Sequence, residues 1–318
     1  MNKWEMCREN PHFHHLIRSS DPPHPHINGS FRGYLFVCGI LHIFTSYYVV
    51  LIMAQLKIIV LMKQVPDPNV EVEIDEKTGV IKREKVEAVV NPLDLHALEE
   101  ALRIKEKYGA HVTVISMGPP MAEAVLREAI ALGADRAILL SDRALAGSDT
   151  LATSYALSKA IEKVGEYDLI LCGLKATDGE TGQVGPEISS FLGIPVLTYI
   201  SKLELKDSRT IVAERIVEGG YQIVEASLPA IVTVVREINE PRLPTLRGKI
   251  KAKSAEIETW TVADIGVDPR NVGLEGSPTR VVKVYSAKIA RRGRIVGGED
   301  PEKAVDELIK FLMERGLI

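Results

Sequence analysis

The sequence predicts an α/β fold, in which a domain with a parallel sheet carries antiparallel additions and is followed by an extended C-terminal arm. From residue 53 to residue 200, short apolar runs alternate with amphipathic segments, which is typical of buried parallel strands joined by helices. After residue 200, apolar and polar residues alternate, as in antiparallel strands with one solvated face. Residues 239–299 are rich in Pro, Gly and basic residues without sustained periodicity. A stretch of this kind favours an arm packed on another subunit over a long internal loop.

The composition excludes several classes of protein. The chain has 318 residues, of which 26% are charged, and a formal net charge of −4, so we expect no nucleic-acid partner and no disordered chain. Three cysteines cannot build a disulfide scaffold. No Cys-x-x-Cys or paired His/carboxylate set suggests a metal site, and no set of side chains suggests nucleophilic catalysis. We therefore expect no metal and no catalytic residue, but a chain that holds a cofactor.

The first 52 residues differ in composition from the remainder, because they contain six of the eight histidines and two of the three cysteines. Residues 34–53 carry no charged side chain and are about as long as a membrane-spanning helix, so a membrane anchor is one interpretation. We favour another, in which residues 1–52 are an upstream extension and the working chain starts near Met53. Met53 leads directly into a strand-like run.

The elements up to residue 200 are predicted from apolar runs and helix signals. Buried strands are expected at 56–62, 111–117, 137–141, 168–172 and 196–200. The first long helix has Asn91 as its N-cap, Pro92 at the first helical position and Gly109 as its stop. Helices are expected at 92–108, 120–132, 149–164 and 182–192, and a short hairpin at 70–82.

The elements after residue 200 are predicted from the change in period. The strands expected there, as antiparallel additions to the sheet, are 203–205, 211–217, 221–224 and 230–235. A terminal amphipathic helix is expected at 301–315, since Ala304, Leu308, Phe311 and Leu312 recur on one stripe.

The candidate site lies where the parallel strands end, because ligands of open parallel sheets bind beyond the carboxyl ends of the strands. The segment 173–184, GLKATDGETGQV, joins a buried strand to a helix. Its glycines permit close backbone approach, and a helix N-terminus presents free N–H groups to a phosphate. Asp178, Thr181 and Gln183 offer further polar groups to a ribose or phosphate. The other segments at strand ends are 61–63, 91–94 and 117–119.

Plainer interpretations of these residues remain open at this point. No Gly-x-Gly-x-x-Gly sequence follows the first strand, and no Walker A sequence is present. Asn91 alone is equally well explained as a simple helix cap. The plainer interpretation of Lys63 and Lys175 is that they are ordinary solvated charges.

Residues 213–233, AERIVEGGYQIVEASLPAIVT, resemble the signature of the β subunit of electron transfer flavoprotein. The resemblance extends from Met53 to Ile318 and includes KIIVLMKQVPD, VNPLDLHALEEALRIKE, ALGADRAILL and NEPRLPTLRGKIKAK. It implies a nucleotide-binding α/β domain over residues 53–238. It also implies that residues 239–318 form an arm and a terminal helix that pack on the alpha subunit.

The resemblance also implies which residues bind. Leu246 matches the leucine that anchors the family's recognition loop in partner dehydrogenases. The residues expected to line the nucleotide pocket are Leu61, Lys63, Asn91, Pro92, Leu93, Asp94, Met117, Gly173, Ala176, Thr177, Asp178, Gly179, Thr181, Gly182, Gln183 and Val184.

The nucleotide implied by the resemblance depends on the loop after the fourth strand. Members that bind structural AMP carry a run of aspartates followed by Asn-Gln-Thr-Gly, whereas this loop reads DGETGQVGP. It is more similar to the electron-bifurcating group, whose β subunit holds a second FAD. There NADH is the electron donor, and the redox chemistry belongs to the cofactor.

In the bifurcating group, one electron passes through the alpha-subunit FAD to a partner dehydrogenase or quinone oxidoreductase, and the other to ferredoxin or flavodoxin. Such complexes are cytoplasmic, with peripheral membrane contact through partner subunits as a variant. One alternative is a non-bifurcating shuttle subunit with structural AMP. Another is a stand-alone adenine-nucleotide-binding protein, against which the long arm speaks.

Overall fold

The computed structural model describes residues 55–67, 88–282 and 300–318. The extension 1–52, the anchor alternative at 34–53 and the hairpin expected at 70–82 lie outside the described residues. In the part of the chain that is described, no helix is both long and apolar enough to cross a membrane.

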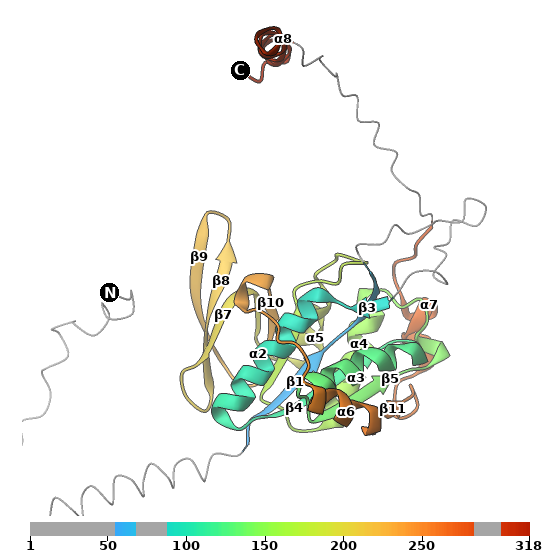
Figure 1. The fold of residues 1–318 in the computed structure, drawn as a ribbon. Helices are drawn as coiled ribbons and strands as arrows, with labels where there is room; N and C mark the ends of the chain where they lie inside the picture. The colour runs from blue at the N-terminus through green and yellow to red at the C-terminus, as the bar shows by residue number, and fades with distance from the viewer. Residues whose placement is uncertain (1–54, 68–87, 283–299) are drawn as a thin grey trace, which may run out of the picture. The chain divides into compact units, whose positions relative to one another are not determined.

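The described residues of the domain form a nine-stranded sheet in the order β11-β5-β4-β1-β6-β10-β7-β8-β9 (Figure 1). Strand pairs are parallel from β11 to β7, and β7, β8 and β9 pair antiparallel. The strands are β1 Lys57–Leu61, β4 His111–Met117, β5 Arg136–Leu140, β6 Leu169–Gly173, β7 Val196–Leu205, β8 Thr210–Val217, β9 Gly220–Ser227, β10 Ala230–Val234 and β11 Glu258–Trp260. The predicted class, a parallel sheet with antiparallel additions, is confirmed.

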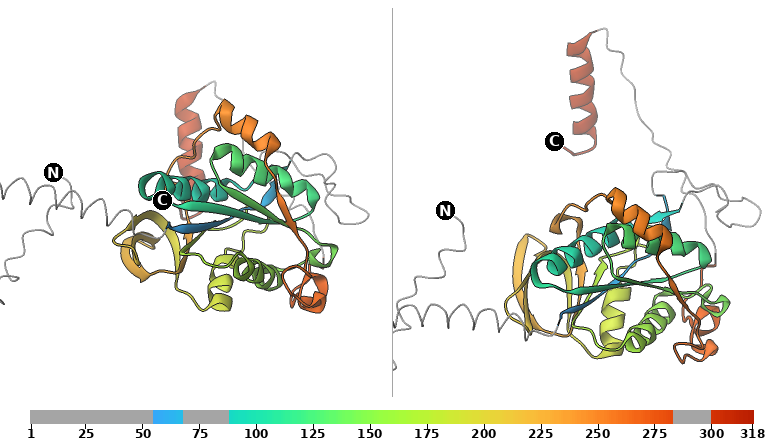
Figure 2. Two further views of the ribbon diagram at one scale, coloured as in Figure 1. Left: turned by 90° about the horizontal axis from the view of Figure 1, so that it is seen from below. Right: turned by 60° about the horizontal axis from the view of Figure 1, so that its bottom comes forward.

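Helices cover both faces of the sheet (Figure 2). On one face lie α2 (Pro92–Tyr108), α3 (Glu123–Leu132) and α6 (Leu246–Ser254), and on the other α4 (Thr150–Val164) and α5 (Val184–Leu192). In the central strand β1, Ile58 and Val60 pack toward the first set of helices, while Ile59 and Leu61 pack toward the second. This strict alternation explains the continuous apolar run, because a strand covered on both faces has no solvated side.

Apart from the hairpin at 70–82, which lies outside the described residues, the strands and helices predicted before residue 195 are confirmed, with ends that differ by a few residues. The helix expected from residue 182 begins at Val184, because Gly182 has a φ of +65° and cannot continue a right-handed helix. A short antiparallel pair, β2 (Gln64–Pro66) and β3 (Ala88–Val90), was not predicted. It connects the end of β1 to α2.

Strand β10 corrects one prediction. Residues 230–235 were expected as an antiparallel addition, but β10 is parallel to both neighbours, β6 and β7, and all five of its residues are buried. Two strands expected at 196–200 and 203–205 are one strand, β7, with a register shift between Ile200 and Lys202. Strand β7 pairs parallel with β10 along one edge and antiparallel with β8 along the other.

Part of the region expected as irregular is ordered on the domain. Helix α6 contributes Ala252 to the core beside α3, and β11 adds a parallel strand beside β5. The structure also contains the short helix α7 (Gly273–Gly276). The predicted terminal helix is confirmed as α8 (Pro301–Glu314). The packing of residues 239–318 on another subunit remains a prediction.

Candidate functional site

The strand order reverses at β1 and β6. From β1 the chain continues through α2 on one face to β4, and from β6 it continues through α5 on the other face to β7. Connections that leave neighbouring parallel strands toward opposite faces open a crevice beyond the carboxyl ends of those strands, the usual position of a ligand. Hydrogen bonds bring the predicted segments 61–63, 91–94 and 173–184 together here. The segment 117–119 follows β4, on the other side of β1.

Asn91 connects the first turn of α2 to the loop after β6. Its side-chain Nδ2 donates to the carbonyl of Lys175 at 3.1 Å, and its Oδ1 accepts from the N–H of Thr177 at 3.2 Å. The side chain makes no hydrogen bond that caps the helix. The interpretation of Asn91 as a simple cap is therefore wrong, and the residue fixes the loop.

Asp94 lies one turn further and points into the protein. Its Oδ2 accepts from the backbone N–H of Lys63 at 2.8 Å, and its Oδ1 accepts from the backbone N–H of Gly173 at 3.1 Å. The residue is 5% exposed. Burial raises the pKa of Asp94 to about 7, against hydrogen bonds from Asn91, Lys63 and Gly173 that lower it.

The two lysines that were open to interpretation as solvated charges are paired. Lys63 Nζ lies 2.7 Å from Asp178 Oδ1 and 2.8 Å from Oδ2, and Lys175 Nζ lies 3.1 Å from Glu180 Oε1. Both pairs are accessible to solvent, so each contributes no more than about 1 kcal/mol to stability. The Lys63 pair ties the end of β1 to the loop after β6 and keeps a cation beside the crevice.

The loop between β6 and α5 contains a buried hydroxyl without a partner. The side-chain hydroxyl of Thr177 is buried and has no hydrogen-bond partner among the described residues. Helix α5 begins without a side-chain cap. Pro186 has no N–H, so Val184 and Gly185 carry the N–H groups that the start of the helix can present to an anion. The exposed residues of the loop are Asp178, Gly179, Glu180, Thr181 and Gln183, and its half-buried residues include Ala176 and Gly182.

Other predicted residues have less direct positions. Leu61 is buried in the core on the α4/α5 face, and Met117 and Val184 pack against the same cluster. Pro92 is exposed, and Leu93 is half-buried against the end of β6. These side chains form apolar surroundings rather than polar contacts.

Two buried hydroxyls at strand ends were not predicted as site residues. Ser116 on β4 and Thr233 on β10 have no hydrogen-bond partner among the described residues for their side chains. Each stands one residue before the end of a strand that is otherwise largely apolar. A hydroxyl brings no packing advantage inside an apolar strand. Its presence near the end of such a strand is therefore a sequence signal for a functional residue.

Comparisons with known proteins agree with this architecture. Residues 78–265 match the family model described as electron transfer flavoprotein domain. A relative named electron transfer flavoprotein subunit beta, from Thermoanaerobacterium thermosaccharolyticum, is 49% identical over 264 residues, which is 83% of this chain and 100% of the relative. The chain belongs to the β-subunit branch of the electron transfer flavoprotein family.

Two further relatives of this electron transfer flavoprotein chain carry other names. One is the caffeyl-CoA reductase-Etf complex subunit CarD of Acetobacterium woodii, 44% identical over 264 residues, which is 83% of this chain and 100% of the relative. The other is protein FixA of Azotobacter vinelandii, 45% identical over 251 residues, which is 77% of this chain and 89% of the relative. The resemblance inferred from the motifs is thereby confirmed, and the chain functions in electron transfer.

The groups at the ends of β1 and β6 are of the kind that bind the phosphate and ribose of a nucleotide. They include the unpartnered buried hydroxyl of Thr177, the cation of Lys63 and the uncapped start of α5. Within the described residues, no cluster of three or more His, Cys, Asp or Glu side chains is suited to hold a metal ion.

Leu246 lies elsewhere on this β subunit, as the first residue of α6. It is 76% exposed, and Leu243 and Ile250 beside it are also exposed. Thr245 caps the helix by accepting from the N–H of Gly248 at 3.0 Å. The structure thus presents Leu246 to solvent, as a partner-binding residue requires.

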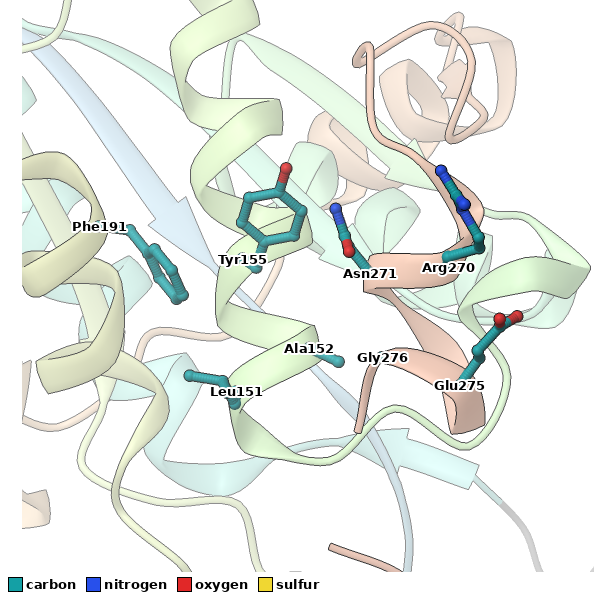
Figure 3. Close-up of a pocket in the computed structure, with 8 residues that line it drawn as sticks. All are labelled: Leu151, Ala152, Tyr155, Phe191, Arg270, Asn271, Glu275 and Gly276. Carbon is teal, nitrogen blue, oxygen red and sulfur yellow. The ribbon is translucent and has the colours of Figure 1, made fainter. Parts of the chain in front are cut away.

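A cavity of about 450 Å³ is lined by residues of α4, α5, α7 and the segment before α7 (Figure 3). None of the predicted binding residues lines it. Its apolar side is Tyr155 and Phe191, whose ring centroids are 5.6 Å apart, and Arg270 on the opposite side is paired with Asp268. The charged residues that line the cavity, Arg270 and Glu275, are both exposed, so we locate the candidate site at the ends of β1 and β6 instead.

Proposed function

We propose that this β subunit holds an adenine nucleotide, FAD, in the crevice beyond β1 and β6. The observation that carries the proposal is the buried hydroxyl of Thr177, which has no partner among the described residues although Asn91 fixes its loop. A buried hydroxyl without a partner costs about 1–3 kcal/mol. A bound group that pairs with the hydroxyl offsets this cost.

The groups around Thr177 support a phosphate in the same place. The N–H groups at the start of α5 are directed at an anion by the geometry of a helix, and the helix dipole adds to the attraction. Lys63 supplies a cation. The exposed side chains of Thr181 and Gln183 are then available to the ribose, whereas both carboxylate oxygens of Asp178 are paired with Lys63.

FAD is favoured over AMP by the loop sequence DGETGQVGP and by a relative that belongs to a reductase-Etf complex. When bound, FAD supplies the hydride and single-electron chemistry. The residues of this chain bind the nucleotide, orient it and exclude water from it. In this proposal NADH is the electron donor.

The acceptors in this proposal are the alpha-subunit FAD, which serves a partner dehydrogenase or quinone oxidoreductase, and ferredoxin or flavodoxin. Residues 239–318 would contact the alpha subunit, and the apolar side chains that α8 exposes, such as Leu308 and Met313, suit a packed interface. Leu246 would anchor the partner oxidoreductase. The location we propose for such a complex is the cytoplasm.

The test is a count of cofactors in the complex. The chain is co-expressed with its alpha subunit, and the flavin and nucleotide released from the purified complex are quantified, together with bleaching by NADH. Two FAD per heterodimer, both bleached by NADH, is the expected result. One FAD with one AMP would replace the FAD proposal with the AMP shuttle, and no second nucleotide would remove the crevice as a nucleotide site.

A matched pair of variants assigns the second nucleotide to this crevice. Thr177→Val deletes the unpartnered hydroxyl at nearly constant volume, and we expect the second nucleotide to be retained several-fold less well. Thr113→Val makes the same change at a buried position inside β4, where retention should equal the wild type. Equal retention in both variants would show that Thr177 makes no contact with the nucleotide.

A further inference from the structure

We propose that Asp94 is the positioning residue of the nucleotide site: its two carboxylate oxygens hold the ends of β1 and β6 together and thereby set the path of the loop 174–183, without touching the nucleotide. The inference rests on the function proposed above. It changes the role expected from the family resemblance, in which Asp94 was one of the residues lining the pocket.

The hydrogen bonds of Asp94 begin where the strand ladder stops. The last paired residues of β1 and β6 are Leu61 and Cys172. Beyond them, the N–H groups of Lys63 and Gly173 both donate to Asp94, at 2.8 Å and 3.1 Å. The carboxylate therefore replaces the missing ladder partner for both strands.

The same turn of α2 also holds the other side of residue 63. The backbone N–H of Asn91 donates to the carbonyl of Lys63 at 2.9 Å, while Asp94 accepts from the N–H of Lys63. Both backbone groups of Lys63 are thus bound to α2. The side chain of Asn91 then binds the loop itself, at Lys175 and Thr177.

The contact between α2 and the end of β6 leaves no space for a side chain at Gly173. A Cβ there would lie 2.5 Å from Asp94 Oδ1 and 2.7 Å from Leu93 Cβ. The loop therefore leaves β6 directly from its contact with Asp94. A displacement of this contact would move the segment that carries Thr177.

Asp94 is unsuited to a direct contact with a ligand. It is 5% exposed, and both of its oxygens already accept from backbone N–H groups. The titratable groups around it are Lys63 at the end of β1, Cys172 on β6 and, in the loop, Asp178, which pairs with Lys63. Because burial raises its pKa to about 7, the carboxylate gains a proton within an accessible pH range. The proton occupies an oxygen that otherwise accepts, so the hold on the loop weakens as pH falls.

The experiment measures the dissociation constant for FAD of the alpha–beta complex after the second nucleotide has been removed, at pH 6 and pH 8.5. In the wild type we expect FAD to bind several-fold more weakly at pH 6. Asp94→Asn replaces one acceptor oxygen by a donor that faces a backbone N–H, so we expect binding at pH 8.5 to weaken about ten-fold and its pH dependence to disappear. Gly173→Ala should also weaken FAD binding, since it keeps the carboxylate but displaces the strand end.

The matched control is Glu100→Gln, on the same helix. Burial also raises the pKa of Glu100, whose carboxylate accepts from Asn239 rather than from the loop. This variant should keep the wild-type affinity and pH profile. Hydrogen exchange of peptides covering 173–183 should increase in Asp94→Asn and not in Glu100→Gln.

The outcomes separate the inference from the proposed function. If the wild type binds no FAD beyond that of the alpha subunit, the proposed function fails. If the wild type binds FAD and Asp94→Asn keeps its affinity and pH dependence, the positioning role is refuted, even where the variant melts at a lower temperature. If Asp94→Asn does not fold, Gly173→Ala decides, and unchanged FAD affinity in that variant refutes the inference.

Discussion

Replacing Arg242 with methionine should destabilise this chain by about 2–3 kcal/mol and loosen the segment that leads to Leu246. Arg242 Nε donates to Glu99 Oε2 at 2.7 Å and its Nη2 donates to Glu99 Oε1 at 3.1 Å, and the guanidinium also pairs with Glu106. The side chain of Glu99 is 6% exposed. The substitution therefore leaves a buried carboxylate that has lost its main partner.

The size of the expected loss of stability follows from the hydrogen bonds that Glu99 keeps in Arg242→Met. Removing one partner of a buried ion pair costs about 3–5 kcal/mol. Here Arg103 Nε still donates to Glu99 at 3.1 Å, and the backbone N–H of residue 242 does so at 3.2 Å, which lowers the cost to about 2–3 kcal/mol. The pair with Glu106, whose side chain is 61% exposed, adds less than about 1 kcal/mol. For a domain of this size the loss corresponds to about 5–10 °C in Tm.

The pH dependence of the loss of stability in Arg242→Met shows whether the loss originates at the carboxylate of Glu99. Burial would raise the pKa of Glu99, but hydrogen bonds from Arg242 and Arg103 hold it below its ordinary value. A carboxyl with a lowered folded-state pKa stabilises the fold above its unfolded pKa, and this contribution disappears as pH falls through the folded-state pKa. The difference in unfolding free energy between wild type and Arg242→Met should therefore be complete at pH 7 and shrink as the pH falls below the unfolded pKa of a glutamate, about 4.3, so that it is already smaller at pH 4.

The assay is urea unfolding of the purified complex or chain at pH 7 and at pH 4, with Arg103→Met as the matched control. Arg103 contacts the same carboxylate but is 47% exposed, so its removal should cost about 0.5 kcal/mol. A loss below 0.5 kcal/mol for Arg242→Met, an equal loss in both variants, or a loss that is unchanged at pH 4 would refute the argument.

Three further outcomes are expected. Burial raises the pKa of the Cys172 thiol, so Cys172 in the native protein should resist iodoacetamide at pH 8 for hours, as judged by mass spectrometry, and react on unfolding. Gly185→Ala should lower stability by about 1–3 kcal/mol, because the added Cβ would lie 2.5 Å from Thr233 Cγ2. The control is Gly220→Ala, whose added Cβ would have no atom within 4 Å, and it should change Tm by less than about 2 °C. Leu246→Glu should leave Tm unchanged and slow reduction of a partner oxidoreductase at least ten-fold, and unchanged rates would remove Leu246 as the anchor.

Local pattern was sufficient for most of the sheet and failed where strand direction depends on distant neighbours. β1, β4 and β6 were predicted because each is an apolar run that needs cover on both faces. The run of β10 has the same character, yet its position after the β8–β9 pair favoured an antiparallel addition. Its parallel partners, β6 and β7, begin about 61 and 34 residues earlier in the sequence, and no local pattern encodes that pairing.

Helix α6 and strand β11 were missed for a related reason. α6 reads LRGKIKAKS, which has a glycine and four basic residues in nine positions, so its intrinsic pattern is not that of a core helix. It is stabilised by tertiary contacts, since Ala252 packs into the core and Arg127 on α3 donates to the carbonyl of Ala252 at 2.7 Å. Helical structure that depends on such contacts is invisible to periodicity.

The structure brings three of the predicted strand-end segments together, 61–63, 91–94 and 173–184, but the roles of their residues depend on long-range contacts. The bonds of Asp94 to Lys63 and Gly173 span 31 and 79 residues, and the pair of Lys63 with Asp178 spans 115. A sequence places Asn91 and Asp94 at a helix start, where a cap and an acidic first turn are sufficient explanations. The alternative roles appear only when the strand order is known.

The spacing of Asn91 and Asp94 nevertheless has a physical meaning that applies beyond this chain. Residues three apart in the first turn of a helix lie on one face, so both side chains of the Asn-Pro-x-Asp segment point away from the solvent side of α2. The first turn of α2 is bound both to the end of β1 and to the loop after β6, whose connections depart toward opposite faces. The connections after β1 and β6 lie on opposite faces of the sheet and cannot hold each other in place. A crevice at such a point therefore needs one element that binds both strand ends. An amide that binds the loop, followed three residues later by a carboxylate that binds the strands, meets that requirement within a single turn.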